Sequence, residues 1–305
     1  MLDNRRRDRE ARMPSIFRTP ADRTAYLGAY DEMLRRWPRP TLRSFDTGLG
    51  STNVIEVGDP GLPPLVLLPP VSVSATAWFP IVGMLCRHHR IFAIDVVGDA
   101  GRSTLIRMPR SGADYADWLV ECFHALGLER PAVVGHSYGG WLTLQLAINR
   151  PAAIGPIILL APASGLYPFH WYARLFLRLA EKLPFRPPAR RVLEAQVHRG
   201  YELDGTFVAL MDAVSAHVRT HVLFPTPLSD DELTSIKTPS LILIGEDERL
   251  YDPAAALDRA RLLIPNVDAR LVPQASHLLP MERPGFVDAA IEAFLDDAAL
   301  AGYRA

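Results

Sequence analysis

Cysteine is scarce in this sequence. The 305 residues include only Cys86 and Cys122, which are too few for a disulfide framework and lack the paired spacing of a metal site. We expect both to be small buried thiols in helices. A chain of this length buries enough surface to fold without disulfides or a structural metal. Because a phosphate-binding glycine loop is also missing, the sequence implies no metal or organic cofactor.

An excess of basic residues is missing as well. Lysine and arginine together number 33, against 34 aspartates and glutamates, so the net charge is -1. Nucleic-acid-binding proteins usually carry a basic surplus, and we therefore expect no nucleic-acid partner. The hydrophobic share of 49% excludes a generally disordered or fibrous chain.

Long apolar runs are absent too. No segment reaches the roughly 18 apolar residues that a membrane-spanning helix needs. The arginine-rich start, from Arg5 to Arg12, looks like the head of a targeting signal, but no apolar core follows it. We expect a loose N-terminal tail, no membrane association and a cytoplasmic location.

The sequence instead alternates between short apolar runs and helix-like segments. Five runs have the unbroken hydrophobicity that strands need when both faces of a sheet are covered. They are residues 65–68, 91–94, 132–134, 157–160 and 241–244. Helix-like segments occupy residues 78–86, 115–126, 140–149 and 254–263. This alternation predicts an α/β fold with parallel strands and crossover helices.

Further elements are expected at both ends, and the alternation breaks once in the middle. The end elements are a helix at 22–37 capped by Asp22, strands at 42–46, 53–57 and 269–272, and a helix at 284–295. Between Ala163 and Leu228 no strand pattern occurs, and a structureless loop of that length is improbable. We predict a tail and helix over residues 1–40, an α/β core over 41–162 and 229–305, and an inserted helical cap over 163–228.

One motif carries chemistry. Residues 135–139 read Gly-His-Ser-Tyr-Gly, a G-x-S-x-G pattern that follows a predicted strand and opens a predicted helix. The sharp turn strains the backbone at Ser137, and the flanking glycines let the chain pass without collision. The Ser137 hydroxyl is then presented at the carboxyl end of the sheet, where such folds bind ligands. We interpret Ser137 as a nucleophile.

A serine nucleophile needs a base to take its proton. Of the nine histidines, His277 follows the last predicted strand in a loop that returns to the carboxyl end of the sheet. We predict His277 as the base. His136 is adjacent to Ser137, and neighbours around a sharp elbow are expected to point apart.

A carboxylate must orient that histidine. The loop after residues 157–160 has no acidic residue before Glu181, which excludes that loop. The remaining candidates cluster after residues 241–244, and they are Glu246, Asp247, Glu248 and Asp252. The resulting chain order is Ser, acid, His.

With these motifs in this order, the sequence resembles the α/β-hydrolase superfamily, and within it the capped carboxylesterase-like branch. The resemblance covers about residues 42–298 and rests on residues 69–78, 95–103, 135–140, 245–253 and 277–284. It implies a mostly parallel central sheet with helices on both faces. The implied activity is that of a serine hydrolase that cleaves a carboxylic ester of a small or medium apolar substrate through an acyl-enzyme.

Three departures from the family pattern affect the site residues. Pro69 and Pro70 replace the usual His-Gly pair, but Val71 keeps the amide that, with Tyr138, would form the oxyanion hole. The loop at 95–103 is one residue longer than usual, and we expect it to be structural or to line the pocket. The usual acid stands three residues after a glycine, which here is Glu248, with Asp247 and Asp252 as alternatives.

The predicted cap contains a cluster of aromatic residues between Tyr167 and Phe176. It either packs the cap or forms an aromatic wall over an apolar ligand. On the second interpretation, the candidate substrate-binding residues are Ser72, Trp78, Phe169, Trp171 and Tyr172.

Two rival functions are compatible with this sequence. One keeps the triad but performs C–C bond hydrolysis, lyase or cyclase chemistry, or thioester cleavage, and the Pro69-Pro70 departure favours it. The other is a non-catalytic receptor for a small molecule, which the complete triad disfavours. The fold alone does not choose between them.

Overall fold

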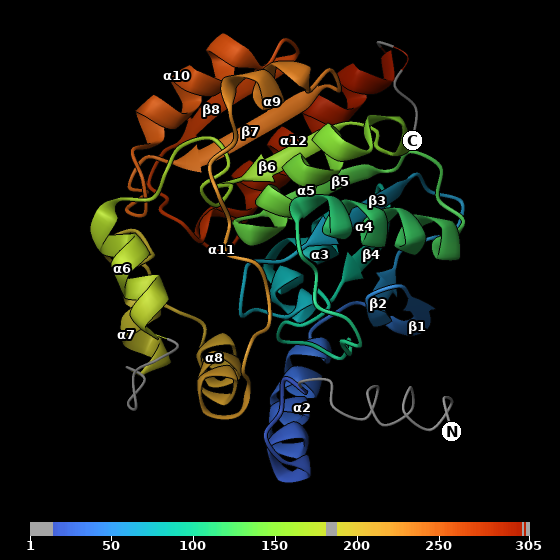
Figure 1. Cartoon of the computed structure of the whole chain (residues 1–305), viewed down its shortest axis with the longest axis vertical. Coiled ribbons are helices and arrows are strands. Elements are labelled where there is room, and N and C mark those ends of the chain that lie inside the picture. The colour runs from blue at the N-terminus through green and yellow to red at the C-terminus, as the bar shows by residue number, and fades with distance from the viewer. Residues whose placement is uncertain (1–14, 181–187, 301, 303–305) are drawn as a thin grey trace, which may run out of the picture.

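The computed structural model describes residues 15–180, 188–300 and 302. The predicted tail with its arginines at positions 5–12 lies outside the described residues. Figure 1 shows a sheet with helices packed around it, and a group of helices at one end of the molecule.

The central sheet has eight strands in the order β1-β2-β4-β3-β5-β6-β7-β8. Two antiparallel pairings, β1 with β2 and β2 with β4, form one edge, and the remaining neighbours are parallel. The strands are β1 (Thr41–Thr47), β2 (Gly50–Val57), β3 (Pro64–Leu68), β4 (Arg90–Ile94), β5 (Ala132–His136), β6 (Ile157–Leu160), β7 (Ser240–Gly245) and β8 (Val267–Val272). The α/β prediction is confirmed, since the apolar runs are the buried central strands.

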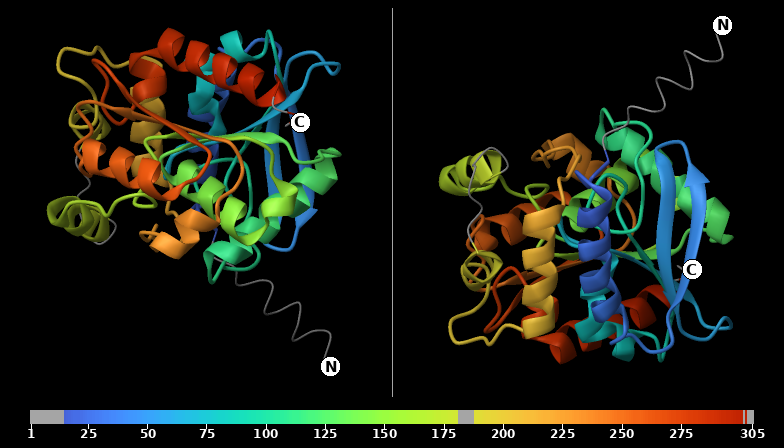
Figure 2. Two further views of the ribbon diagram at one scale, coloured as in Figure 1. Left: turned by 90° about the horizontal axis from the view of Figure 1, so that it is seen from above. Right: turned by 90° about the horizontal axis from the view of Figure 1, so that it is seen from below.

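Helices cover both faces of the sheet (Figure 2). One face carries α4 (Gly112–Leu126), α5 (Tyr138–Asn149), α9 (Asp230–Ser235) and α10 (Pro253–Leu263), whose apolar residues form one core cluster. The other face carries α3 (Phe79–Leu85), α11 (Leu279–Glu282) and α12 (Pro284–Leu300), which belong to a second cluster. There are also two short 3-10 helices, the buried η1 (Ala75–Trp78) and η2 (Pro151–Ala153), which has no buried residue.

The described residues between 163 and 228 contribute no strand to the sheet. They form α6 (Trp171–Ala180), α7 (Ala189–Glu194) and α8 (Gly205–His217). We refer to residues 163–228 as the cap segment, and the domain boundaries remain our prediction.

The N-terminal helix α2 (Pro20–Leu34) lies beside α8 (Figures 1 and 2). The backbone N–H of Arg219 donates to the Ile16 carbonyl at 2.8 Å, and His217 Nδ1 lies 2.7 Å from Asp22 Oδ1. The described part of the N-terminal segment, from Ile16 through α2, therefore packs directly on the cap segment.

Local signals set the helix ends differently from the prediction. Thr19, not Asp22, is the N-cap of α2, and Asp22 closes a capping box from the third helical position. Among the described residues, no helix combines the length and apolar character needed to cross a bilayer.

Candidate active site

Ser137 lies on a strained elbow between β5 and α5. Its backbone φ is 52°, a region that residues with a side chain seldom adopt. A Cβ at Gly135 would lie 2.3 Å from the Gly139 carbonyl oxygen, and one at Gly139 would lie 2.0 Å from that of Leu68. Both positions therefore need glycine, as the motif predicts.

The His277 ring bridges Ser137 and Glu248. Its Nε2 lies 2.8 Å from Ser137 Oγ, and its Nδ1 lies 2.6 Å from Glu248 Oε2. All three residues are buried. His277 is in the loop after β8 and Glu248 in the loop after β7, so the parallel sheet brings both to the edge where Ser137 sits.

The second carboxylate oxygen of Glu248 is held by the backbone. Oε1 accepts the N–H groups of Arg249 and Leu250, each at 2.8 Å. Burial raises the pKa of Glu248, but the charge and hydrogen bond of His277 and the two amides outweigh it and keep the pKa below its usual value. Glu248 is therefore ionised at neutral pH.

The alternative acids lie elsewhere. Asp247 contacts Nδ1 of His198 rather than His277. Asp252 is the N-cap of α10 and accepts the Ala255 N–H at 3.0 Å. Among these candidates, the geometry around His277 favours Glu248.

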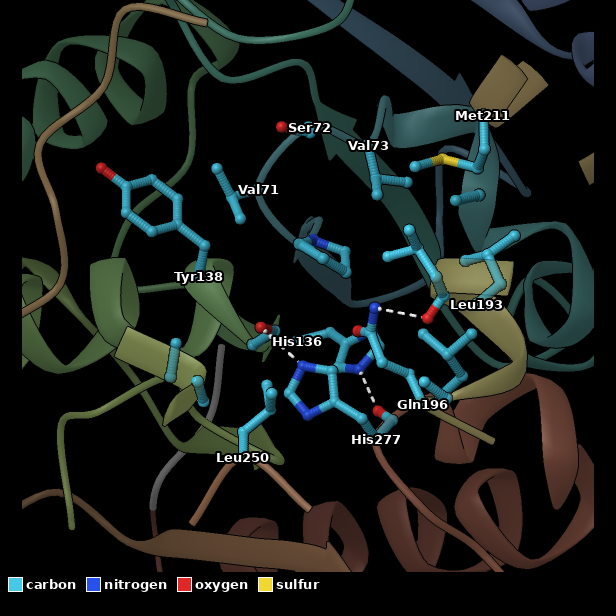
Figure 3. A pocket seen from close by; sticks show the side chains of 18 of the residues that line it. Val71, Ser72, Val73, His136, Tyr138, Leu193, Gln196, Met211, Leu250 and His277 are labelled. Carbon is cyan, nitrogen blue, oxygen red and sulfur yellow. Dashed lines mark hydrogen bonds between the residues drawn. The ribbon is translucent and has the colours of Figure 1, made fainter. Parts of the chain in front are cut away.

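His136 was expected to point away from its neighbour Ser137, yet it is also part of the site. It lines the same cavity, and its Nε2 lies 2.7 Å from the backbone carbonyl oxygen of His277 (Figure 3). Burial and the neighbouring His277 lower the pKa of His136 to about 3. The ring is therefore neutral, and its Nε2–H donates to that carbonyl. Sequence adjacency to Ser137 was the available signal, but it does not give the direction of the ring.

The cap segment also contacts the loops that carry the acid and the base. The Gln196 carbonyl accepts the His277 N–H at 3.1 Å, and the Ala195 carbonyl accepts from Arg249 Nη1 at 3.3 Å. The Tyr201 hydroxyl donates to the Met281 carbonyl at 3.0 Å. The backbone near His277 is thus held from the cap side.

A cavity of about 1220 Å³ opens in front of Ser137, and its walls are mainly apolar. The predicted residues that line it are Val71, Tyr138, Ser72, Trp78, Phe169 and Tyr172. Figure 3 shows the loop of Val71, Ser72 and Val73 across the cavity from His277.

Trp171 does not line the cavity, so its prediction as a substrate contact is wrong. Its side chain is 75% exposed. Ala173, two positions later on α6, is buried and does line the cavity. Residues two apart lie about 200° apart around a helix, which turns Trp171 to the outside.

The contribution of α8 to the cavity was not predicted from the sequence. Phe207, Met211 and Val214 line the cavity and follow the helical spacing of an apolar stripe. That spacing was a readable signal, but it is the same for a stripe that packs a core.

The described residues hold no group of three or more His, Cys, Asp or Glu side chains suited to a metal ion. The site has a serine at a strand–elbow–helix turn, with a histidine and a buried carboxylate from neighbouring loops above a mostly parallel sheet. This combination defines the α/β class of serine hydrolases. The chain belongs to the alpha/beta hydrolase family, whose model matches residues 65–290.

Known relatives agree in fold and in class. The chain is 32% identical over 280 residues to the uncharacterized carboxylesterase nap of Bacillus subtilis (strain 168), covering 89% of this chain and 92% of the relative. It is 29% identical over 275 residues to carboxylesterase YbfK of the same organism, covering 88% and 92%. The crystal structure of naproxen esterase from Bacillus subtilis superposes with a TM-score of 0.85 at 30% identity, covering 91% of this chain and 99% of that one. These similarities confirm the predicted family, fold and hydrolase class.

Proposed function

We propose that this protein hydrolyses carboxylic esters of small or medium apolar molecules, with Ser137 as nucleophile, His277 as general base and acid, and Glu248 as the orienting carboxylate. The observation that carries the proposal is the His277 ring between Ser137 Oγ and the buried Glu248, at the wall of a large apolar cavity. The carboxylesterases among its relatives support the ester bond as the target.

The first half of the reaction forms an acyl-enzyme. Ser137 Oγ attacks the ester carbonyl carbon while its proton moves to Nε2 of His277. The carbonyl π electrons move to the oxygen, and the N–H groups of Val71 and Tyr138 stabilise the resulting oxyanion. When the intermediate collapses, the C–O bond to the alcohol breaks, and the departing oxygen takes the proton from His277.

The second half releases the acid. A water molecule gives a proton to His277 and attacks the acyl carbon, and the bond to Ser137 Oγ breaks as the proton returns to Ser137. Glu248 stays ionised throughout and stabilises the His277 cation. The apolar walls favour apolar groups on the substrate.

The test is a panel of p-nitrophenyl esters of increasing acyl length, assayed with the wild-type enzyme and with Ser137→Ala. We expect the wild type to hydrolyse the panel with a preference for medium chains, and Ser137→Ala to lose at least about a thousandfold in kcat with an unchanged far-UV spectrum. Turnover by a folded Ser137→Ala enzyme near the wild-type rate would refute the nucleophile assignment. A wild type that reacts with a fluorophosphonate but cleaves no ester would refute ester hydrolysis and favour other triad chemistry.

The cytoplasmic location remains a prediction.

A further inference from the structure

A buried carboxylate that the mechanism above does not use lies behind the loop of Val71. Asp99 has no exposed surface, and its Oδ1 and Oδ2 accept the Ser72 N–H at 3.0 and 2.9 Å. Oδ1 also accepts the Ala100 N–H at 2.7 Å. A buried carboxylate is tolerated only when such hydrogen bonds replace water, and here one of the donors is an amide of the active-site loop.

Ser72 has an unusual backbone that this contact explains. Its φ is 59°, in the left-handed region that residues with a side chain enter only at an energetic cost. Such a conformation persists when the surroundings determine it. The two carboxylate oxygens of Asp99, both within 3.0 Å of the Ser72 nitrogen, are a contact able to do so.

The loop around Val71 is fixed on both sides. Before Val71, the Pro69 carbonyl accepts the Gly139 N–H at 3.1 Å. After Val71, the Ser72 N–H is held by Asp99. Pro70 has no N–H to donate. The direction of the Val71 N–H therefore depends on these two anchors, one of which is Asp99.

We propose that Asp99 is a positioning residue for the oxyanion hole: its carboxylate holds the Ser72 amide and thereby aims the Val71 N–H at the developing oxyanion. This inference rests on the proposed function. It connects two of the three family departures found in the sequence. The Pro69-Pro70 pair replaces the usual residues in one loop, and the longer loop at 95–103 supplies the carboxylate that supports it.

The loop that carries Asp99 is itself anchored. The Gly98 carbonyl accepts the His221 N–H at 2.6 Å, and Gly98 has a φ of 80°. A Cβ at Gly98 would lie 2.5 Å from the His221 carbonyl oxygen, so the close approach of the two chains requires glycine. The carboxylate is thus presented from a rigid support, as precise positioning requires.

The test compares Asp99→Ala and Asp99→Asn with the wild type, using p-nitrophenyl butyrate and a trifluoromethyl ketone inhibitor that forms an oxyanion when Ser137 adds to it. The control is Asp31→Ala, because Asp31 pairs with Arg102 at the surface end of the same loop. For Asp99→Ala we expect kcat to fall about a hundredfold, since a misaimed donor costs that much. KM should stay within about threefold, because the donor acts mainly in the transition state. The inhibition constant of the ketone should rise by the same factor as kcat falls.

Asp99→Asn keeps one acceptor oxygen but places an NH2 donor among N–H groups, and we expect a loss of about tenfold in kcat. Asp31→Ala should stay within about twofold of the wild type in both measurements.

A folded Asp99→Ala enzyme with wild-type kcat would overturn the inference. The corresponding methyl ketone, which forms no stable adduct, provides a second comparison. If Asp99→Ala raises the inhibition constants of both ketones by the same factor, the inference is also overturned. If Asp99→Ala does not fold, Asp99→Asn decides, and a kcat within about twofold of the wild type would overturn it. Failure of the proposed function is a separate result, because the wild type itself would then hydrolyse no ester.

Discussion

His136 and His277 have ring centroids 5.5 Å apart, and their partners give them different chemistry. His277 lies between a carboxylate and a hydroxyl, so it can accept a proton and be stabilised as a cation. His136 is buried against a backbone carbonyl, and its pKa of about 3 keeps it neutral. Side-chain environment, rather than residue type, separates the proposed base from its neighbour.

The low pKa of His136 predicts a pH-dependent stability. In the unfolded chain a histidine binds a proton below about pH 6.5, whereas in the folded protein His136 stays neutral down to about pH 3. Below pH 6.5 the unfolded state therefore binds more protons, and stability falls as the pH falls. Between pH 7 and pH 5, His136 should remove about 2 kcal/mol from the free energy of unfolding.

The measurement is urea unfolding of the wild type and of His136→Gln at both pH values. The glutamine can still donate to the His277 carbonyl but does not titrate. We expect the variant to lose about 2 kcal/mol less than the wild type between pH 7 and pH 5. The same loss in both proteins would contradict the buried, neutral state of His136.

The acid is tested by the pair Glu248→Gln and Asp247→Asn. The glutamine should keep the shape of the site but favour the wrong His277 tautomer, and we expect kcat to fall on the order of 10⁴-fold, by analogy with serine proteases. Asp247→Asn removes a carboxylate that contacts His198 and not His277, so we expect a far smaller loss in kcat. Steady-state kinetics on one ester decide, and near-wild-type kcat in Glu248→Gln would reject the assignment.

At the residue scale, the sequence predicted Ser137 and His277 because a motif and a position after a strand identify them. The acid rested only on the family resemblance, which favoured Glu248 and kept Asp247 and Asp252 as alternatives. Asp247 and Glu248 are adjacent, and the side on which each lies depends on loop dihedrals that no residue pattern encodes. The direction of the His136 ring was missed for the same reason.

At the element scale, α8 forms a wall of the cavity. Met211 is half-buried and lies between Phe207 and Val214 on the stripe that faces the cavity. The outer face of the helix differs, because Ala209 is exposed there and does not line the cavity. The size of the residue at position 211 should therefore limit the length of the substrate.

Met211→Trp tests this directly, with Ala209→Trp as the control on the same helix. The larger ring should fill the far end of the cavity, so kcat/KM for a long-chain ester should fall by about tenfold or more, while that for the acetate stays within about threefold. The measurement is the p-nitrophenyl ester profile of each variant. Equal losses for short and long esters, or the same profile change in Ala209→Trp, would contradict the role of α8.

Elements were predictable where burial leaves a pattern. Central strands such as β6 and β7 are buried along their whole length, and their apolar runs were readable. Helix ends were harder to predict than strands, because the start of α2 depends on a capping box at Thr19. Trp171 was misplaced because aromatic composition does not tell which side of a helix faces a cavity.

At the scale of the whole molecule, two apolar clusters lie on opposite faces of the sheet. The second one continues from the strands into α2 and α8, with Tyr26, Phe207 and Leu210 among its buried members. The sequence predicted the break in alternation at residues 163–228. It could not predict that α2 would pack on α8, because that contact joins segments nearly 200 positions apart, as in the pairing of Asp22 with His217.

The proposed reaction begins with one covalent event, the attack by Ser137 on an electrophile in the cavity. The direct measurement is peptide mapping by mass spectrometry after incubation with a fluorophosphonate. We expect a single modified residue, Ser137, with the modification lost in urea-denatured protein and in folded His277→Ala, since the nucleophile needs its base. Modification of a different residue in the native enzyme would refute Ser137 as the nucleophile. Equal modification of Ser137 with and without His277 would refute His277 as its base.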